Sequence, residues 1–300
     1  MKSIDEKVLA AYNAGIEKNR LRQGLGLIEF ERTKELLHAY LPHPHAFEHK
    51  QTVIYDIGGG YGEYAYYLTA LGYEVDLFDL SPTNIAMSHD LGQEHGFSLH
   101  CAEVADARHI GREDESADAI LLLGPLYHII SAEERRLCLL ECSRLLKPQG
   151  ILFTAAITRY ATTLWALTSY HKNQLLDDPA FYHMLEQEVK SGHHIPPENS
   201  RYQGMGQSYF HLPREFKSEV EEAGFQDMQV HGVVGPGWLA QNVDEVWGDP
   251  MKRESIMRIV RLCDKEDSIM GLSTHLLGVY RKDCHSRERT VTAKEVWEVF

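Results

Sequence analysis

The chain has 300 residues, of which 43% are apolar and 25% are charged, and its formal net charge is −14. A folded chain of this length buries roughly 75% of the surface that its unfolded form exposes, so its core needs no disulfide or metal. The acidic charge disfavours nucleic acid and anionic membranes as partners, because both present negative phosphate groups, and no apolar run approaches the ~18 residues of a membrane span.

The first fifty residues are expected to form helices. Apolar residues recur at helical intervals over residues 3–21 and again over 28–41, where Pro42 ends the pattern. No strand of the expected sheet lies between these helices. We therefore expect residues 1–50 to form a helical cover.

From residue 51 onward, strands alternate with helices. The expected strands are apolar or β-branched runs, separated by helices of about 10–15 residues. This alternation is typical of right-handed βαβ units and of a parallel sheet that helices cover on both faces. Residues 51–157 are therefore expected to form the cofactor-binding half of a doubly wound α/β sheet. Its strands are expected at residues 52–57, 74–80, 97–104, 118–123 and 150–157.

The alternation breaks over residues 158–212, where helical, aromatic-rich sequence precedes a turn-rich stretch. It returns with a helix and with strands at residues 227–233 and 275–281. We therefore expect an inserted helical lid at 158–212, completion of the same sheet at 213–282, and a tail at 283–300.

The five cysteines are scattered, and none forms a CxxC pair. Cys138 and Cys142 have i,i+4 spacing in an apolar helical segment, which indicates a buried helix face rather than a disulfide or a metal clamp. The 17 histidines show no metal-ligand spacing, and the N-terminal residues lack the apolar stretch of a signal peptide. We expect a reduced, cytoplasmic protein without a metal site.

The segment most informative about function is the glycine-rich stretch at residues 53–62. A strand that runs into a glycine turn and then a helix lets a ligand approach backbone N–H groups, because no Cβ stands in the way. Gly60, Gly62 and Ala65 fit the GxGxxG/A pattern of dinucleotide sites. An acidic residue followed by GxGxG, the pattern of S-adenosylmethionine sites, is also present from Asp56 to Gly62. The glycines alone leave both ligands open.

Two further observations favour S-adenosylmethionine, and a third fits either ligand. The carboxylate of Asp56 is unfavourable beside a pyrophosphate but favourable beside an ammonium and a sulfonium. The strand–insertion–strand order after the fifth strand suits seven strands better than two mononucleotide halves. Asp79 ends the second strand, where it can accept hydrogen bonds from the ribose hydroxyls of either cofactor.

Taken together, these motifs resemble those of the class I S-adenosylmethionine-dependent methyltransferases, over residues 53–157 and 213–281. Residues 103–107, Glu-Val-Ala-Asp-Ala, resemble the third-strand motif whose Asp-Ala pair meets the adenine in that family. Residues 144–150 resemble its R-x-L-K-P-G-G motif, with Gln149 where glycine is usual.

The run Leu-Gly-Pro-Leu-Tyr-His at residues 123–128 is similar to one in a bacterial subgroup of that family. The resemblance implies S-adenosylmethionine as cofactor and a seven-stranded, mostly parallel sheet of order 3-2-1-4-5-7-6, with strand seven antiparallel. The cofactor-binding residues that it implies are Asp56, Gly58, Gly59, Gly60, Gly62, Asp79, Leu80, Asp106, Ala107, Leu123, Gly124 and Tyr127.

Several of these residues have plainer alternatives. Asp56 or Asp79 could cap the helix that follows, and Gly59 could serve only to form the turn. Asp106 could be an ordinary loop aspartate, and Leu123 with Gly124 could be a plain strand end.

Methyl transfer from a sulfonium is an in-line displacement, so the protein must hold the two reactants together and exclude water. Tyr127 and His128 follow the fourth strand, where open α/β sheets place ligands. We expect Tyr127 to contact the cofactor or acceptor and His128 to act as a base, although both could be packing residues. The substrate-binding candidates are Tyr12, Arg32, Tyr209 and His211. Arg20 and Glu29 could likewise bind the carboxylate of the donor or the acceptor, and all of these side chains could instead be solvated or structural.

The leading hypothesis is a methyltransferase that acts on a small-molecule substrate. Residues 124–127 read Gly-Pro-Leu-Tyr, not the N/D-P-P-Y/F run that resembles amino-methylating nucleic acid enzymes. An NAD(P)-dependent oxidoreductase and a non-catalytic S-adenosylmethionine-binding sensor remain as alternatives. Exposed aromatic residues in the N-terminal and inserted segments could also form a homodimer contact.

Overall fold

The computed structural model describes residues 6–13, 19–45, 51–198, 201–202 and 204–283. Within these residues, seven strands form one sheet of order β3-β2-β1-β4-β5-β9-β8, and β9 is antiparallel to both of its neighbours. β6 and β7 form a separate small sheet, so β8 and β9 are the sixth and seventh strands of this one. The observed order is therefore the expected 3-2-1-4-5-7-6 with an antiparallel seventh strand. The strands are β1 (Val53–Ile57), β2 (Glu74–Asp79), β3 (Cys101–Val104), β4 (Ala117–Leu122), β5 (Leu146–Ile157), β8 (Phe225–Gly232) and β9 (His275–Lys282).

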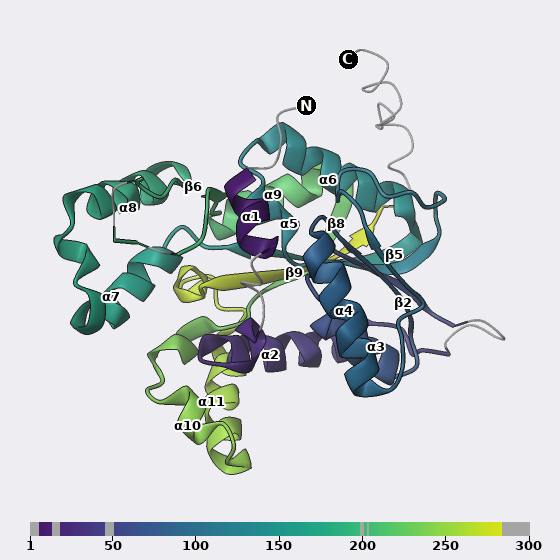
Figure 1. Cartoon of the computed structure of the whole chain (residues 1–300), viewed down its shortest axis with the longest axis horizontal. Coiled ribbons are helices and arrows are strands. Elements are labelled where there is room, and N and C mark those ends of the chain that lie inside the picture. Colours follow the sequence, from purple (N-terminus) through teal and green to yellow (C-terminus); the bar gives the residue numbers. More distant parts are fainter. Residues whose placement is uncertain (1–5, 14–18, 46–50, 199–200, 203, 284–300) are drawn as a thin grey trace.

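Helices cover both faces of this sheet, and the central strands alternate between the two resulting cores (Figure 1). In β4, Ile120 packs into one core and Leu121 into the other, as a strand with two buried faces requires. One face carries α2 (Leu25–Tyr40), α3 (Glu63–Ala70) and α4 (Pro82–His95). The other carries α5 (Pro125–His128), α6 (Ala132–Leu145) and α9 (Pro213–Glu222).

The buried cysteines bear out the expectation for their helix. Cys138 and Cys142 lie on the inner face of α6, and both are completely buried in the core. The spacing that could have suggested a metal clamp therefore belongs to a packed helix face.

The order of the strands creates a crevice at the centre of the sheet. From β1 the chain continues to β2 and β3 on one side, and it then returns to place β4 on the other side. The segments that follow β1 and β4 therefore diverge above the carboxyl ends of these two strands. In open α/β sheets this is where ligands bind.

The inserted residues form a separate lobe rather than part of the sheet. It consists of α7 (Ala161–Asn173), a 3-10 turn at Leu175–Asp177, α8 (Pro179–Ser191) and the short hairpin of β6 (His193–His194) with β7 (Ser208–Tyr209). The lobe has a small core of its own, in which Phe181 and Met184 are buried. In Figure 1 it projects sideways from the sheet.

A second group of helices packs against α2. It contains η3 (Gly235–Leu239), α10 (Val243–Val246) and α11 (Pro250–Cys263), and the 3-10 turn η4 (Met270–Leu272) leads back to β9. Their shared core includes Ile28 of α2. No helix of the described residues is long and apolar enough to cross a membrane.

Two strands differ in extent from the expectation. β3 begins at Cys101 rather than at residue 97, because α4 ends at Gly96, with φ +78°, and the chain needs the next residues to return to the sheet. β5 begins earlier than expected, at Leu146, which pairs with Ala117. A register shift then accommodates the turn, in which Gln149 has φ +64°.

The expected N-terminal helix over residues 3–21 is also shorter. α1 covers Glu6–Asn13, and a 3-10 turn, η1, covers Arg20–Arg22. The remainder of that prediction falls on residues 3–5 and 14–18, outside the described residues.

Candidate active site

The turn after β1 packs so tightly against its surroundings that some of its positions have room only for glycine. At Gly59, a Cβ would lie 2.4 Å from the carboxyl carbon of Asp56, and at Gly58 it would lie 2.4 Å from the ring of Pro125. Gly58 and Gly60 also have φ of +70° and +62°, a region that disfavours residues with a side chain. Gly59 therefore does more than form the turn, because its missing side chain leaves room for a buried carboxylate.

That carboxylate belongs to Asp56, which is 1% exposed at the base of the turn. Neither of its oxygens has a hydrogen-bond partner among the described residues. Burial, together with the negative charge of Asp79, raises the pKa of Asp56 to about 7. An unsatisfied buried carboxylate of this kind is unfavourable unless a donor or a cation reaches it.

Asp79, at the end of β2, ties the glycine turn to the next loop. Its Oδ2 accepts a hydrogen bond from the N–H of Gly60 at 2.9 Å, and its Oδ1 accepts from Ser81 and Asn84 at 2.8 and 3.0 Å. The side chain that caps α4 is that of Ser81, which accepts from the N–H of Asn84. Asp79 therefore organises the loop, and it is not the cap of α4.

Asp106 follows β3 and lies in a loop with Ala107. Its carboxylate accepts hydrogen bonds from the guanidinium of Arg108, with the shortest contact at 2.5 Å, and Arg108 also binds Glu134. Although burial opposes it, these hydrogen bonds hold the pKa of Asp106 below its usual value. Asp106 is thus ionised and held in place by a partner that the sequence analysis did not identify.

The end of β4 meets the glycine turn directly. A Cβ on Gly124 would lie 3.0 Å from the carbonyl oxygen of Gly58, so the two turns touch through their backbones. The chain then enters α5, where Tyr127 is 6% exposed and its ring packs against that of His128, with centroids 4.6 Å apart. The sequence analysis placed these two residues at the strand end but did not predict the short helix that carries them.

These segments line one cavity that is partly open to solvent, with about 1070 Å³ of space between protein atoms when the open part is included. All of the predicted cofactor-binding residues line it except Gly62, which precedes the first turn of α3 and packs towards Leu77. Tyr12 of the N-terminal helix and His128 also line the cavity. Arg20, a candidate from the sequence, lines the cavity too, and the lining residues without an assignment from the sequence are Leu9, Leu21, Tyr61, Glu63, Tyr64, Ser81, Ala105, Pro125 and Ile129.

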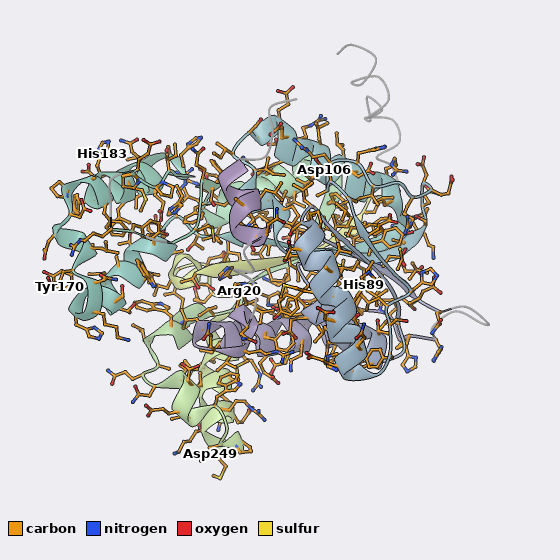
Figure 2. All side chains as sticks on the ribbon, viewed as in Figure 1. Arg20, His89, Asp106, Tyr170, His183 and Asp249 are labelled. Atoms are coloured by element: carbon orange, nitrogen blue, oxygen red, sulfur yellow. The ribbon has the colours of Figure 1, made fainter. Side chains whose placement is uncertain are left out.

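Arg20 lies near the centre of the molecule between α1 and α2 (Figure 2). Its guanidinium donates two hydrogen bonds to the carboxylate of Glu29, at 3.0 and 3.1 Å. The ring of His275 lies 3.5 Å from the same carboxylate. Although burial opposes it, the positive charge of Arg20 holds the pKa of Glu29 below its usual value.

Three predicted substrate-binding residues lie outside this cavity. Arg32 is held by Asp264 and Glu35, and it joins α2 to the chain beyond α11. Tyr209 packs under the guanidinium of Arg135, and His211, fully buried, is bound to Glu219 at 3.0 Å. These side chains hold elements together, and two of their partners, Asp264 and Arg135, are far away in the chain, where the sequence could not reveal them.

The inserted segment 158–212 also contributes no described residue to the cavity lining. Its helices close upon their own small core, and Tyr170 and His183 lie at the outer edge of the lobe (Figure 2). The cover over the cavity comes instead from α1 and η1.

Two of the unassigned lining residues had a local signal in the sequence. Tyr61 and Tyr64 follow the glycine turn closely in the sequence, and this position could have indicated that they line the cavity. Leu9 had none, because its place depends on how the N-terminal segment crosses the sheet.

Comparison with known proteins agrees with the fold. Residues 55–154 match the family model described as a methyltransferase domain. No curated protein matches the chain in sequence.

Three solved structures are similar in fold over most of their length. An S-adenosylmethionine-dependent methyltransferase from Methanosarcina mazei is 16% identical, with a TM-score of 0.55, covering 83% of this chain and 97% of the other. A methyltransferase candidate complexed with the Haloferax volcanii Trm112 methyltransferase activator is 16% identical, with a TM-score of 0.54 and coverages of 92% and 97%.

The third is the Burkholderia thailandensis 1,6-didemethyltoxoflavin-N1-methyltransferase, with 1,6-didemethyltoxoflavin and S-adenosylhomocysteine bound. It is 13% identical, with a TM-score of 0.53, and the match covers 93% of this chain and 86% of the other. Residues 55–154 thus match a methyltransferase domain, and the strand order and the glycine turn agree with that match.

Proposed function

We propose that the protein transfers the methyl group of S-adenosylmethionine to a small-molecule acceptor bound under its N-terminal helix. The observation that carries this proposal is the cover, because Leu9 and Tyr12 of α1 and Arg20 of η1 line the same cavity as the glycine turn. The cavity lies at a switch point of the sheet, where open α/β sheets bind ligands. The net charge of −14 disfavours an acceptor rich in phosphate.

The residues at the turn fit the cofactor. Asp56 offers a buried carboxylate that lacks a partner among the described residues, which suits the ammonium of the cofactor's amino acid part. We assign the ribose to Asp79, whose carboxylate lines the cavity, and the adenine to the loop of Asp106 and Ala107. An uncompensated carboxylate at this place is unfavourable for a pyrophosphate, so the residues favour S-adenosylmethionine over a nicotinamide dinucleotide.

When bound, S-adenosylmethionine supplies a methyl group on a positively charged sulfur, which is already an activated leaving group. The protein's residues therefore have to orient the acceptor, exclude water and accept a proton. We assign Tyr127, buried at the end of β4, to contact with the reactants, and His128 beside it to the proton of the acceptor.

The cellular setting that we propose is the reducing cytoplasm. The cysteines of the described residues are all free, namely Cys101, Cys138, Cys142 and Cys263. Free buried thiols are usual where glutathione keeps cysteines reduced.

The experiment that tests the proposal measures S-adenosylhomocysteine formed by the purified chain. S-adenosylmethionine is supplied together with an ultrafiltered metabolite pool, or with RNA, or with protein from the same cells. We expect product with the metabolite pool alone. The variant Gly59→Val serves as a control, since its side chain would collide with Asp56 and block the turn.

Product with RNA or protein but not with metabolites would contradict the small-molecule acceptor. Binding of S-adenosylmethionine without product from any fraction would instead support the sensor alternative.

A further inference from the structure

Two cavity-lining residues from distant parts of the chain are directly hydrogen bonded. The hydroxyl of Tyr12, on α1, lies 2.5 Å from Nε2 of His128, on α5, and the two residues are 116 positions apart. Their rings meet edge to face, with centroids 5.1 Å apart and planes at 88°. The N-terminal helix therefore does more than cover the cavity, since it brings a phenol to the imidazole that follows β4.

Neither ring nitrogen of His128 is directly accessible to a ligand in the cavity. Its Nδ1 is buried and has no hydrogen-bond partner among the described residues. Nε2 is covered by the hydroxyl of Tyr12. A molecule in the cavity can therefore exchange a proton with this imidazole through the oxygen of Tyr12.

The surroundings keep His128 neutral. Burial, together with the positive charge of Arg20, lowers its pKa to about 3. The groups that face the imidazole are Tyr12 from α1, Tyr127 from its own helix and Arg20 from η1, whose charge is balanced by Glu29. A neutral imidazole has a lone pair with which Nε2 can accept the phenol proton.

We infer that Tyr12 and His128 form a proton relay, and that the methyl acceptor is an uncharged molecule with a removable proton on oxygen or nitrogen. This inference rests on the proposed methyl transfer. The lone pair of the acceptor atom forms the bond to the methyl carbon as the carbon–sulfur bond breaks, and that electron pair remains on sulfur. The acceptor proton passes to the oxygen of Tyr12, and the phenol proton of Tyr12 passes to Nε2 of His128.

The charge balance of the cavity explains why the acceptor is uncharged. Methyl transfer to a neutral acceptor removes the positive charge from sulfur and leaves a proton, so the relay keeps one positive charge in the cavity. His128 becomes a better base as the sulfur loses its charge, because the nearby cation that disfavours an imidazolium is gone. Among the described lining residues, Arg20 is the only permanently cationic side chain, and Glu29 balances it, so a carboxylate or phosphate acceptor finds no counter-charge there.

The first test is a nitrogen NMR measurement on the full chain with labelled histidine, in complex with S-adenosylhomocysteine. Between pH 6 and pH 8 we expect His128 to be neutral, with the proton on Nδ1 and Nε2 accepting a hydrogen bond. The variant Tyr12→Phe should shift the Nε2 resonance. The matched control is Tyr67→Phe, which removes another tyrosine bonded to a histidine, His38 at 2.6 Å, outside the cavity. A protonated His128, a proton on Nε2, or an unchanged resonance in Tyr12→Phe would overturn the relay.

The second test uses product formation with two sets of acceptors. One set contains neutral phenols and N–H heterocycles, and the other contains carboxylates and alkyl ammonium compounds. We expect product with the first set, and a loss of about 100-fold or more in Tyr12→Phe, with little change in Tyr67→Phe. The affinity for S-adenosylmethionine should change less than about twofold in both variants, since the relay acts on the acceptor proton.

The outcomes separate the relay from the proposed function. Product only with charged acceptors, or equal rates in the two tyrosine variants, would overturn the relay and leave methyl transfer intact. No product with either acceptor set or with the metabolite pool would overturn the proposed function, and the NMR result would still decide whether the relay geometry exists.

Discussion

Arg135 and Glu219 form a buried ion pair that joins α6 to α9. The guanidinium of Arg135 donates to the two carboxylate oxygens of Glu219, at 2.7 and 3.3 Å, and its side chain is 3% exposed. It also donates to the carbonyls of Ile129 and Ile130, at 3.0 and 2.7 Å. One arginine thus fixes the backbone that immediately follows His128.

Loss of the carboxylate from this pair should destabilise the fold. In Glu219→Leu, the charge of Arg135 stays buried without its partner, and we expect a loss of about 3–5 kcal/mol in the free energy of unfolding. Urea denaturation followed by circular dichroism measures the change. The control is Glu254→Gln, which removes a carboxylate from an exposed pair with Arg261, and its midpoint should stay that of the parent. Equal midpoints for the two variants would show that the buried pair is not needed.

The affinity for S-adenosylmethionine should depend on pH through Asp56. Its pKa is raised from the ordinary 3.8 to about 7, so below pH 7 the free protein holds a proton that must leave when the ammonium binds. The affinity should therefore fall as the pH falls from 7 to 5, by up to about tenfold per unit, and level off above pH 7. Calorimetry in buffers of different ionisation enthalpy measures both the affinity and the released proton.

The variant Asp56→Asn should remove this pH dependence. At pH 8 it should also bind S-adenosylmethionine roughly 10- to 100-fold more weakly, because an amide replaces the charged partner of the cation. The raised pKa of Asp56 further implies that its contribution to folding stability is greatest at low pH and is lost as the pH rises from about 4 through 7. A slope of affinity against pH that persists in Asp56→Asn would assign the titration to another group.

Asp79→Ala should weaken binding of the cofactor by about 1–3 kcal/mol. The substitution removes the acceptor proposed for the ribose, and it also releases the N–H of Gly60 and the amide of Asn84 from their present bonds. Calorimetry with S-adenosylhomocysteine measures the change. Asp90→Ala is the matched control, since Asp90 is an exposed aspartate on α4. An unchanged affinity in Asp79→Ala would reject the assigned role.

Gly59→Ala should destabilise the free protein, because the added Cβ would lie 2.4 Å from the carboxyl carbon of Asp56. We expect about 1–3 kcal/mol, the usual cost of overpacking a buried site. Gly248→Ala is the control, since a Cβ on Gly248 meets no atom within 4 Å. If thermal unfolding is the same in both variants, the turn has more room than its geometry indicates.

The sheet was predictable because its signals are local. The burial of β1 and β4 on both faces appears as runs that are apolar except at Asp56 and Asp118, and the glycine turn lies between a strand and a helix. The boundaries were less accurate where a turn lies inside a strand, as at Gln149, since pairing across the sheet and not local sequence decides where β5 begins.

The donor side of the site was predictable for the same reason, whereas the acceptor side was not. The residues from Asp56 to Gly60 are consecutive in the sequence. Asp79, Asp106 and Gly124 lie at the carboxyl ends of β2, β3 and β4, so the parallel strands bring them to the same edge of the sheet. Arg32 and His211 resembled binding residues in the sequence, but Arg32 is paired with Asp264, 232 positions away, and His211 is hydrogen bonded to Glu219, eight positions away. The contact of Tyr12 with His128 depends on the path of the N-terminal segment, which no local pattern specifies.

The backbone contact between the turns of β1 and β4 has a consequence for how such an enzyme can diversify. Gly58 and Gly124 touch with no side chain between them, so this wall of the cavity cannot be reshaped by substitution without parting the two strands. The wall that α1 and η1 add is made of side chains, among them those of Leu9 and Leu21. Selection or engineering for a new acceptor would therefore act on that wall, while the donor is inherited unchanged.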